Sequence, residues 1–433
     1  MIAIDTAFRM PPAPRTLEAS GVSGDLVLQL VTKMLHFGGE LAGTELASRL
    51  GVAFAIIEPA LDLLKRERHC EIGGGSTIGA PAYRYRLTDA GRTRAAVFLE
   101  HNQYVGPLPV PVDQYLAYMR EFGRDRSRAA SRAAIKQAFS HLVISDRVLD
   151  QIGPAVASRH SLFLYGPPGN GKTVISQAIR DVFTGHIAIP HALAVDNHII
   201  RLFDPINHEP IVSEGSAGLE RQPDVDARWI RCRRPAVTVG GELTLDALDL
   251  GFSSAGFYRA PLQALANGGV LVIDDFGRQQ VSPRDLLNRW IVPLESRVDY
   301  LTLQTGQKFQ LPFEAFVVFA TNLKPADLLD EAFLRRIQYK VFAESPTEDE
   351  FIQIFENYCR DQELEVDRSL VEALLETELR PRGVLLRGCQ PRDLIDHALS
   401  LAAYLDQPRA LTLTLLAEAA GTYFVHDRDV SLA

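Results

Sequence analysis

Two short stretches carry the residue types and spacing of a nucleotide site. Residues 166 to 173 read GPPGNGKT, which matches the spacing GxxxxGK[ST], and residues 270 to 277 read VLVIDDFG. In the first pattern glycine backbone N–H groups close on a phosphate, the lysine reaches the β- and γ-phosphates, and the hydroxyl binds Mg²⁺. In the second, an apolar run ends in two carboxylates, which suit a divalent cation. Together they predict a site for ATP with Mg²⁺.

Each residue of the two stretches has an expected role. Lys172 binds phosphate, while Thr173 and Asp274 hold Mg²⁺. Asp275 accepts a proton or orients the attacking water; it is one methylene shorter than the Glu of many ATPases, which predicts slow turnover. The residues expected to line the nucleotide are Gly166, Pro167, Pro168, Gly169, Asn170, Gly171, Lys172, Thr173 and Val174.

The elements around these stretches predict how they meet. Apolar runs at 161 to 165, 270 to 274 and 316 to 320 are separated by helical patterns, which is typical of a parallel sheet covered on both faces. GPPGNGKT lies between the first run and the helical stretch VISQAIRDVF, as a P-loop requires. The fold class predicted is therefore α/β, a P-loop NTPase parallel sheet covered by helices.

Four motifs in order resemble those of an AAA+ ATPase: GPPGNGKT, VLVIDDFG, FATN at 319 to 322 and LRRI at 334 to 337. The resemblance covers residues of about 138 to 425. It implies that Asn322 senses the γ-phosphate and positions water, although an Asn-capped turn is the alternative. It also implies an arginine finger that reaches a neighbouring subunit's nucleotide, with Arg336 the first choice and Arg335 the second, against a solvated arginine pair.

The carboxy-terminal part carries two further features. CQPRDLIDHALSLA resembles the start of an AAA+ lid helix, which implies that Arg392 bends over the γ-phosphate, with Arg387 a weaker candidate. Residues 344 to 433 are predicted to be a helical lid domain. Ser345 with Glu348, and Ser369 with Glu372, read as helix-starting capping boxes.

The distance between the two stretches indicates an insertion. Lys172 and Asp274 lie 274 − 172 = 102 residues apart, and an insert is expected at about 204 to 257, within a core of 138 to 343. Its RWIRCRR segment (228 to 234) either grips an acidic polypeptide or nucleic acid, or is a solvated loop. The pattern resembles the MoxR-like, helix-2-insert-like branch, with a hairpin at 300 to 311 around Gly306. Val143, Ile144 and Ile152 either pack on adenine or belong to the core.

The amino-terminal part resembles a winged helix-turn-helix domain at 24 to 110. Helices are expected at 25 to 37, 44 to 50 and 54 to 68, followed by two strand-like runs around a Gly-rich tip and a helix from Asp89. Eleven Lys/Arg balance eleven Asp/Glu over residues 1 to 110, and the third helix begins apolar and acidic. This favours protein docking or self-association, while Arg84 and Arg86 keep a nucleic-acid role open. Residues 1 to 23 are expected to be a loose arm and 111 to 137 a basic connector.

Composition and charge limit the classes of protein to which the chain can belong. The chain has 433 residues, 46% of them hydrophobic and 23% charged, enough for two or three domains. A net charge of −9 argues against a surface built throughout for nucleic acid. No apolar run reaches the roughly 18 to 20 residues of a membrane span, and no signal peptide is visible, so we expect a cytoplasmic protein with no membrane partner. The four cysteines have no metal-ligand spacing.

These observations lead to one expected function and one alternative. The expected function is an ATP-binding and ATP-hydrolysing AAA+ protein, a homo-hexamer, that remodels an unknown protein partner. The alternative is an ATP-dependent switch that assembles on DNA, like an initiator or loader, with little hydrolysis. A role with nucleic acid is possible but not favoured.

Overall fold

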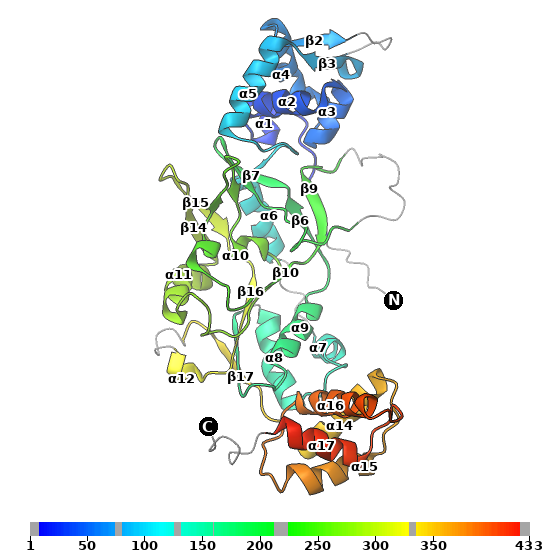
Figure 1. Cartoon of the computed structure of the whole chain (residues 1–433). Helices are drawn as coiled ribbons and strands as arrows, with labels where there is room; N and C mark the ends of the chain where they lie inside the picture. The colour runs from blue at the N-terminus through cyan, green and yellow to red at the C-terminus, as the bar shows by residue number, and fades with distance from the viewer. Residues whose placement is uncertain are drawn as a thin grey trace, which may run out of the picture. The chain divides into compact units, whose positions relative to one another are not determined.

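The computed structural model describes residues 8–73, 80–124, 131–158, 160–211, 224–328 and 335–424 (Figure 1). The chain divides into two compact units. The first comprises Met1–Arg128, Phe183–Val272 and Gln279–Val317, and the second comprises Ala129–Val182, Ile273–Arg278 and Val318–Ala433. This division differs from the domain boundaries expected from the sequence, because the strands that follow residue 183 group with the amino-terminal helices.

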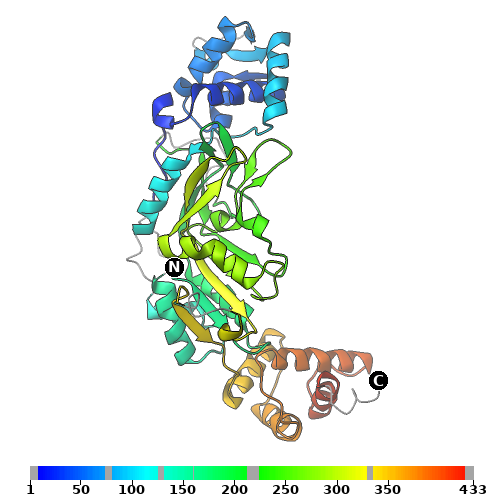
Figure 2. The same ribbon diagram turned by 90° about the vertical axis from the view of Figure 1, so that its left-hand side faces the viewer.

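The amino-terminal helices lie where their periodicity predicts them (Figure 2, blue to cyan). Helices α2 (Gly24–Gly38), α3 (Gly43–Leu50), α4 (Phe54–Arg66) and α5 (Asp89–His101) surround a three-stranded antiparallel sheet of order β1-β3-β2. Its strands are β1 (Glu40–Ala42), β2 (Cys70–Gly73) and β3 (Arg84–Leu87). Ser23 and Thr88 cap α2 and α5 through their hydroxyls. The expected Gly-rich tip, at 74 to 79, lies outside the described residues.

The expectation of a loose arm is wrong for the described part of residues 1 to 23. A short helix, α1 (Leu17–Ser20), forms there, and Pro12 bridges Val225. The Ala13 N–H donates to the Asp224 carbonyl at 3.0 Å, and the Asp226 N–H donates to the Pro11 carbonyl at 2.9 Å. Proline-rich chain is held here because its carbonyls still accept backbone hydrogen bonds. Residues 1 to 7 lie outside the described residues.

The remaining strands of the first unit form a mixed sheet, a strand pair and a hairpin. The mixed sheet has the order β11-β12-β8-β7-β4, with β4 (Val110–Pro111), β7 (Ala192–Val195), β8 (His198–Arg201), β11 (Gly251–Phe252) and β12 (Tyr258–Arg259). β6 (His186–Pro190) pairs antiparallel with β9 (Trp229–Arg233), and β14 (Val298–Thr302) pairs with β15 (Lys308–Pro312). The hairpin around Gly306 is thus confirmed, whereas the added strands begin at His186, before the expected residue 204. Residues 212 to 223 of the expected insert are not described.

Three further helices accompany these strands. Helix α6 (Val112–Arg124) covers the start of the expected connector, of which residues 125 to 130 are not described. Helices α10 (Leu262–Leu265) and α11 (Pro283–Ser296) follow later in the chain. One apolar core joins buried residues of α6, β6, β7, β9 and β15, among them Met119, Ile189, Trp229 and Leu311.

The P-loop sheet has the strand order β10-β13-β16-β5-β17. Its strands are β5 (Leu162–Tyr165), β10 (Ala236–Val239), β13 (Val270–Ile273), β16 (Phe316–Thr321) and β17 (Tyr339–Phe342). β16 and β17 both pair in parallel with β5. Helix α8 (Asp146–Ser158) packs on β17, and α7 (Arg132–Ala138) packs on α8 and on α9 (Lys172–Val182). The expected α/β class and its three apolar strands are therefore confirmed.

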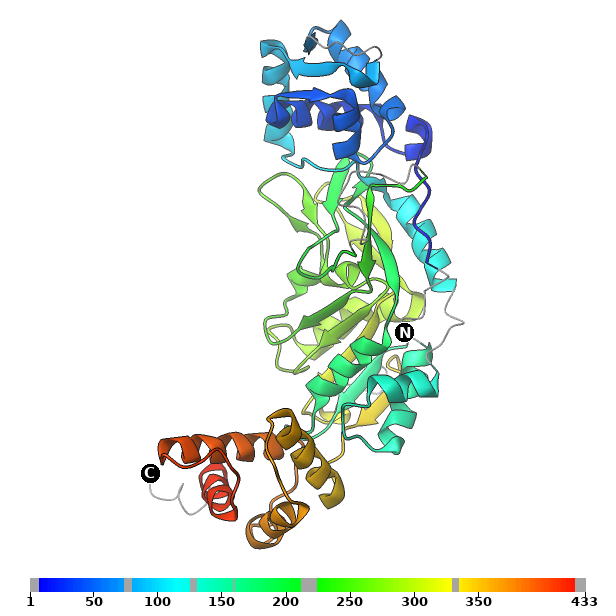
Figure 3. The same cartoon turned by 90° about the vertical axis from the view of Figure 1, so that its right-hand side faces the viewer.

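The carboxy-terminal residues form a helical bundle (Figure 3, orange to red). It contains α14 (Glu348–Asp361), α15 (Arg368–Leu374), a π-helical turn (Leu375–Leu379), α16 (Gln390–Tyr404) and α17 (Leu413–Tyr423) around an apolar core. Both expected helix starts are wrong. Thr347 with Glu350 forms the capping box of α14, and Asp367 caps α15. Ser345 does not cap, since its hydroxyl accepts from Asn170 Nδ2 at 3.3 Å.

No helix among the described residues is long and apolar enough to cross a membrane.

Candidate functional site

The P-loop lies between the end of β5 at Tyr165 and the start of α9 at Lys172. Gly166, Gly169 and Gly171 have φ values of 153°, 82° and 71°, which residues with a side chain rarely adopt. A methyl group at Gly166 would also lie 2.5 Å from the Ala343 carbonyl oxygen. The loop therefore needs glycine at these positions, and its backbone N–H groups precede a helix N-terminus, where anions are stabilised.

Lys172 is buried inside this loop, with 7% of its surface exposed. Its Nζ donates to the Gly166 carbonyl at 2.9 Å and to the Pro167 carbonyl at 2.8 Å. Burial lowers the pKa of Lys172 below its usual value, while the negative charges of Asp274 and Asp275 oppose that effect. The ammonium group is thus held within the phosphate loop, where phosphate oxygens are the acceptors that the motif is built for.

Thr173 and Asp274 meet although 101 residues separate them along the chain. Thr173 Oγ1 donates to Asp274 Oδ2 at 2.8 Å, and Asp274 Oδ1 accepts from the Asp275 N–H at 2.9 Å. A hydroxyl and a carboxylate are the hard oxygen ligands that Mg²⁺ prefers, so the pair fits the expected ion. The described residues contain no cluster of three His, Cys, Asp or Glu that could hold a metal. Most other Mg²⁺ ligands would then come from phosphate and water.

Asp275 and Asn322 form the second contact of the site. Asn322 Nδ2 donates to Asp275 Oδ1 at 3.3 Å, and Asp275 has a φ of 49°, in the left-handed region that Asp tolerates better than most residues. Asn322 follows β16 directly. The preceding Thr321 donates from Oγ1 to the Phe276 carbonyl at 2.6 Å, and the Phe276 N–H donates to the Ala320 carbonyl at 2.7 Å. Thr321 therefore holds together the chain segments that carry Asp275 and Asn322. The sequence analysis did not assign this role to Thr321, although it adjoins Asn322.

The two candidate finger arginines lie away from this cluster. Arg335 is exposed and Arg336 half-buried, in the turn before β17. Because β17 runs parallel to β5, with Tyr339 beside Leu162 and Phe342 beside Tyr165, this turn lies at the opposite end of the pair from the P-loop. The structure thus does not bring either arginine to the chain's own nucleotide site. The residues from 329 to 334 lie outside the described part.

Helix α16 starts at the P-loop, but Arg392, the arginine expected to reach the γ-phosphate, pairs with a neighbouring residue. The Cys389 N–H donates to the Gly169 carbonyl at 2.9 Å, and a methyl group at Gly169 would lie 2.6 Å from Cys389 Sγ and 3.5 Å from Arg387 Cδ. Arg392 instead pairs with Asp393 at 2.9 Å, and 60% of its side chain is exposed. Cys389, for which the sequence analysis gave no role, is therefore a contact of the loop, and Arg387, the weaker candidate, lies beside Gly169.

Asn170 ties the loop to the chain that enters the carboxy-terminal bundle. It is 8% exposed, and its Nδ2 donates to the Ala343 carbonyl at 3.2 Å and to Ser345 Oγ at 3.3 Å. Its Oδ1 is buried without a hydrogen-bond partner. The P-loop thus contacts the carboxy-terminal segments at two places. Asn170 binds Ala343 and Ser345 ahead of α14, and Gly169 binds Cys389 at the start of α16.

The residues expected beside adenine divide into two kinds. Ile152 is fully buried in α8 and belongs to the core, so the core interpretation holds for it. Val143 and Ile144 are half-buried in the segment before α8, which leaves them available for a base.

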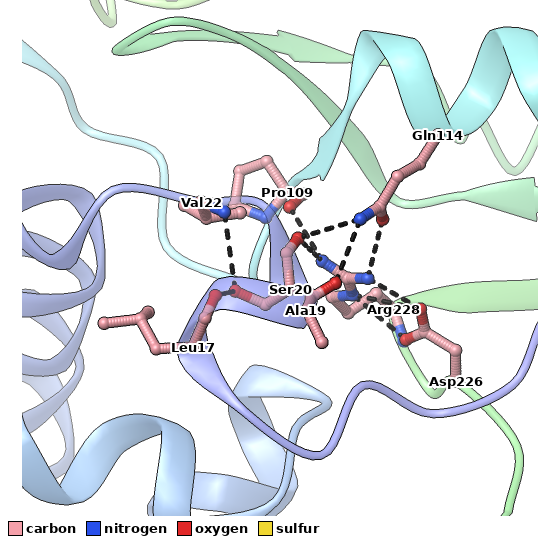
Figure 4. Close-up of polar contacts among 8 residues, drawn as sticks. All are labelled: Leu17, Ala19, Ser20, Val22, Pro109, Gln114, Asp226 and Arg228. Carbon is pink, nitrogen blue, oxygen red and sulfur yellow. Dashed lines mark hydrogen bonds and ion pairs between the residues drawn. The ribbon is translucent and has the colours of Figure 1, made fainter.

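The arginine cluster of RWIRCRR is not a solvated loop, and Arg228 does not face a partner (Figure 4). Arg228 and Asp226 form an ion pair at 2.8 Å with 2% of each side chain exposed. The Arg228 guanidinium also donates to the Ser20 carbonyl at 3.0 Å and to Gln114 Oε1 at 3.1 Å. A buried charge is tolerated only when it is paired and hydrogen-bonded, and this network meets that demand. It fastens α1 and α6 to the start of β9.

The other residues of the cluster range from buried to exposed. Trp229 is buried, and Arg231 lies 5.0 Å from the Phe8 ring centroid. Arg234 donates from Nε to the Gly268 carbonyl at 2.6 Å, and Arg233 pairs with Glu209 at the surface. Residues Trp229–Arg233 of this segment form strand β9, which the sequence analysis did not predict because arginine-rich composition is typical of a basic loop.

Strand β5, the glycine loop, α9 and the carboxylates after β13 together define a P-loop nucleotide-binding fold of the α/β class. Residues 347–422 match a family described as a domain of unknown function (DUF8689). No curated protein matches the chain.

Solved structures of NtrX and RuvB are among those that resemble the chain. NtrX from Brucella abortus has 14% identity and a TM-score of 0.41, covering 68% of this chain and 59% of that one. The same protein in complex with ADP has 14% identity and a TM-score of 0.41, covering 79% and 69%. The RuvB Holliday junction branch migration motor of Thermotoga maritima has 14% identity and a TM-score of 0.38, covering 71% and 74%. The chain thus spans less than two thirds of the first of these structures, and at these low TM-scores the proposals below depend on the chain's own geometry.

Proposed function

We propose that the chain is an AAA+ ATPase that binds Mg-ATP and hydrolyses it to ADP and phosphate. The observation that carries this proposal is the contact between Thr173 and Asp274 at 2.8 Å, beside the contact between Asp275 and Asn322 at 3.3 Å. A P-loop hydroxyl, two carboxylates after one sheet strand and a polar residue after the neighbouring strand thus converge on one place. This is the arrangement that phosphoryl transfer to water requires.

Each residue has a proposed task. Lys172 and the loop N–H groups bind the phosphates, and Thr173 and Asp274 hold Mg²⁺, which would supply charge neutralisation for the β- and γ-phosphates. Asp275 accepts the proton of the attacking water, and Asn322 orients that water and the Asp275 carboxylate. Because positioning dominates the catalysis of phosphoryl transfer, a misplaced carboxylate lowers the rate of hydrolysis more than a less basic one does.

The proposal includes a homo-hexamer in the cytoplasm that remodels a protein partner. Arg335 and Arg336 support a shared site, since they lie at the far end of β17 from their own P-loop. Such residues serve a nucleotide only when it belongs to a neighbouring subunit. The double attachment of the P-loop, through Asn170 and Cys389, gives nucleotide binding a route to the carboxy-terminal bundle.

The alternative, a switch that assembles on DNA, has less support. The arrangement of α2, α3, α4 and the β1-β3-β2 sheet suits a winged helix-turn-helix domain. We propose that residues 24 to 110 belong to this class. However, Arg84 pairs with Glu40 at 2.6 Å and Arg86 pairs with Glu71 at 2.7 Å. The exposed positions of α4 are Ala55, Pro59 and Asp62, with one basic residue, Arg66, at the carboxy-terminal end of the helix. Phosphate contacts need free cations, so protein docking is the role we propose for this module.

The test compares ATP binding with ATP hydrolysis in two variants. We expect Lys172→Ala to lose both, because the phosphates lose their buried cation. We expect Asp275→Asn to bind ATP but hydrolyse it at least about a hundredfold more slowly. Labelled-ATP binding and phosphate release provide the two readouts, and Arg233→Gln, at the surface, is the matched control.

Unchanged hydrolysis in both variants would overturn the proposal. Binding without any hydrolysis in the wild type, together with DNA binding that weakens steeply with salt, would favour the switch instead. If the chain is an ATPase that remodels a protein, we expect a pull-down with the Asp275→Asn variant in the presence of ATP to retain the protein partner. The wild type should release this partner on hydrolysis.

A further inference from the structure

Ala343 bridges the two ends of the P-loop. Its N–H donates to the carbonyl of Tyr165, the last residue before the loop, at 2.8 Å. Its carbonyl accepts from Nδ2 of Asn170, near the end of the loop, at 3.2 Å. Ala343 directly follows β17, the outer strand of the P-loop sheet, which pairs in parallel with β5. One residue beside the sheet therefore joins the residue that enters the loop to a residue near its exit.

The Asn170 amide that makes this contact is buried and only half satisfied. Asn170 is 8% exposed, and its Nδ2 donates to Ser345 Oγ as well, at 3.3 Å. Because the Ala343 carbonyl can only accept, the amide nitrogen must face it, and Oδ1 then has no hydrogen-bond partner among the described residues. A buried acceptor without a partner costs free energy. The bond to Ala343 thus holds the amide in an orientation that leaves its own oxygen unpaired.

Lys172 also holds the loop, but through donors that the phosphates need. Its Nζ donates to the carbonyls of Gly166 and Pro167 at 2.9 Å and 2.8 Å, which uses two of the three N–H donors of an ammonium group. Phosphate oxygens compete with these carbonyls for the same donors. The bond between Asn170 and Ala343 involves no phosphate-binding group, so it holds the loop whether or not phosphate is bound.

We propose that Asn170 is a positioning residue, whose bond to Ala343 fixes the P-loop in the conformation that binds the phosphates. A loop that is already in its binding conformation loses less conformational freedom when the ligand binds, which raises the affinity. The Asn170 side chain therefore acts on the affinity for the triphosphate and not on its cleavage, which depends on Asp275 and Asn322. The inference rests on the proposed function, since it concerns the same P-loop.

The test replaces the Asn170 amide by an apolar group of the same branching. Asn170→Leu keeps the number of side-chain atoms but removes both donors and the unpaired acceptor. We expect the affinity for Mg-ATP to fall about tenfold, the effect of one hydrogen bond, and kcat for hydrolysis to stay within about twofold. Inorganic tripolyphosphate, which has neither base nor ribose, should lose affinity by the same factor. Displacement of a fluorescent ATP analogue and steady-state phosphate release provide the two readouts.

Three further variants separate the hydrogen bond from packing. Because Leu and Ala both lack the donor, we expect Asn170→Ala to cause the same loss, and it decides the question if Leu is too large for the site. Ser345→Ala keeps the bond to Ala343 and should weaken binding by no more than about twofold. Gln177→Leu, on an exposed position of α9, is the matched control and should leave binding unchanged. Urea denaturation of each variant confirms that the chain is folded.

Several results would contradict the inference. Unchanged affinity in both Asn170 variants would reject it, and a loss with only one of two folded variants would indicate packing instead. A fall in kcat at constant affinity would make Asn170 a catalytic residue, and a loss for ATP without a loss for tripolyphosphate would assign it to the base or ribose. A wild type that binds no nucleotide rejects the proposed ATPase, whereas a wild type that hydrolyses ATP beside unaffected Asn170 variants rejects the positioning role alone.

Discussion

Thr173 Oγ1 lies 2.8 Å from Asp274 Oδ2 and donates a hydrogen bond to it. This bond joins the first turn of α9 to the end of β13. The motifs GPPGNGKT and VLVIDDFG therefore contribute to the same site. Asp274 Oδ1 also accepts the N–H of Asp275, so hydrogen bonds orient both oxygens of the carboxylate. A magnesium ion between this hydroxyl and this carboxylate would replace the direct bond.

The first prediction concerns this pair. Thr173→Val removes the hydroxyl with little change in volume, and Asp274→Asn removes the charge. We expect each to lower kcat for ATP hydrolysis by about a hundredfold, because both act on the same ion. The double variant should lose hardly more than either single one. Additive losses in the steady-state rates would show that the residues act separately, and Gln177→Ala, at an exposed position of α9, serves as the control.

The second prediction concerns the length of the side chain at residue 275. Asp275 has a φ of 49° and accepts from Asn322, so its carboxylate is fixed in a backbone conformation in which Asp is common and Glu is not. We therefore expect Asp275→Glu to leave kcat unchanged or lower it, although many ATPases have Glu. Single-turnover rates for the wild type and the variant provide the check. A large gain with Glu would mean that the backbone at residue 275 adjusts freely.

The third prediction tests the contact between the P-loop and α16. A methyl group at Gly169 would lie 2.6 Å from Cys389 Sγ, whereas one at Gly171 meets nothing within 4 Å. Both glycines have a positive φ, so Gly171→Ala measures the backbone strain alone. We expect Gly169→Ala to weaken ATP binding more than Gly171→Ala does, and Cys389→Ala to restore part of the loss. Equal effects of the two substitutions, measured by ATP titration, would mean that α16 moves aside without cost.

The nucleotide site was predictable because its information is local. GPPGNGKT carries its own loop conformation, and the parallel strands that precede Asp274 and Asn322 bring their ends to one edge of the sheet. The contacts of Gly169 with Cys389 and of Asn170 with Ala343 were not predictable, since they depend on how a distant helix and linker pack on the loop. Composition offers no signal for such contacts.

The arginine cluster shows the opposite case, in which a local pattern misleads. RWIRCRR has the composition of a solvated basic loop, yet Arg228 is buried because Asp226, Gln114 and the Ser20 carbonyl surround it. Two of these partners come from segments about a hundred and two hundred residues away, and no spacing rule connects them. Burial of charge is a property of tertiary structure, so neither interpretation of the sequence pattern included a buried ion pair.

The fourth prediction concerns this buried pair. Arg228→Met leaves Asp226 buried without its partner, which we expect to lower the free energy of unfolding by about 3–5 kcal/mol. The matched control is Arg233→Met on the same strand, where 69% of the side chain is exposed and the expected change is within about 0.5 kcal/mol. Replacing both partners, as Asp226→Leu/Arg228→Met, should cost less than Arg228→Met alone. Urea denaturation measures all three, and equal stability of the two single variants would show that the pair is not buried in solution.

The fifth prediction follows from Lys33, which is fully buried in α2 and donates from Nζ to the Asn102 carbonyl at 3.0 Å. Burial lowers the pKa of Lys33 from 10.5 to about 8. Between these two pH values the unfolded chain binds a proton at this lysine that the folded chain has released, so the free energy of unfolding rises with pH. The rise should reach about 3 kcal/mol across the window.

Lys33→Met removes this titration, and the comparison with the wild type cancels the contributions of all other groups. We expect the variant to be the more stable at pH 7, where the wild type must bury a charged ammonium group, and its advantage to shrink steadily above pH 8 as that group is neutralised. Denaturant titrations at intervals from about pH 7 to about pH 10 provide the measurement. A stability difference that stays constant over this range would show that Lys33 keeps an ordinary pKa in the folded chain, and that water reaches its ammonium group.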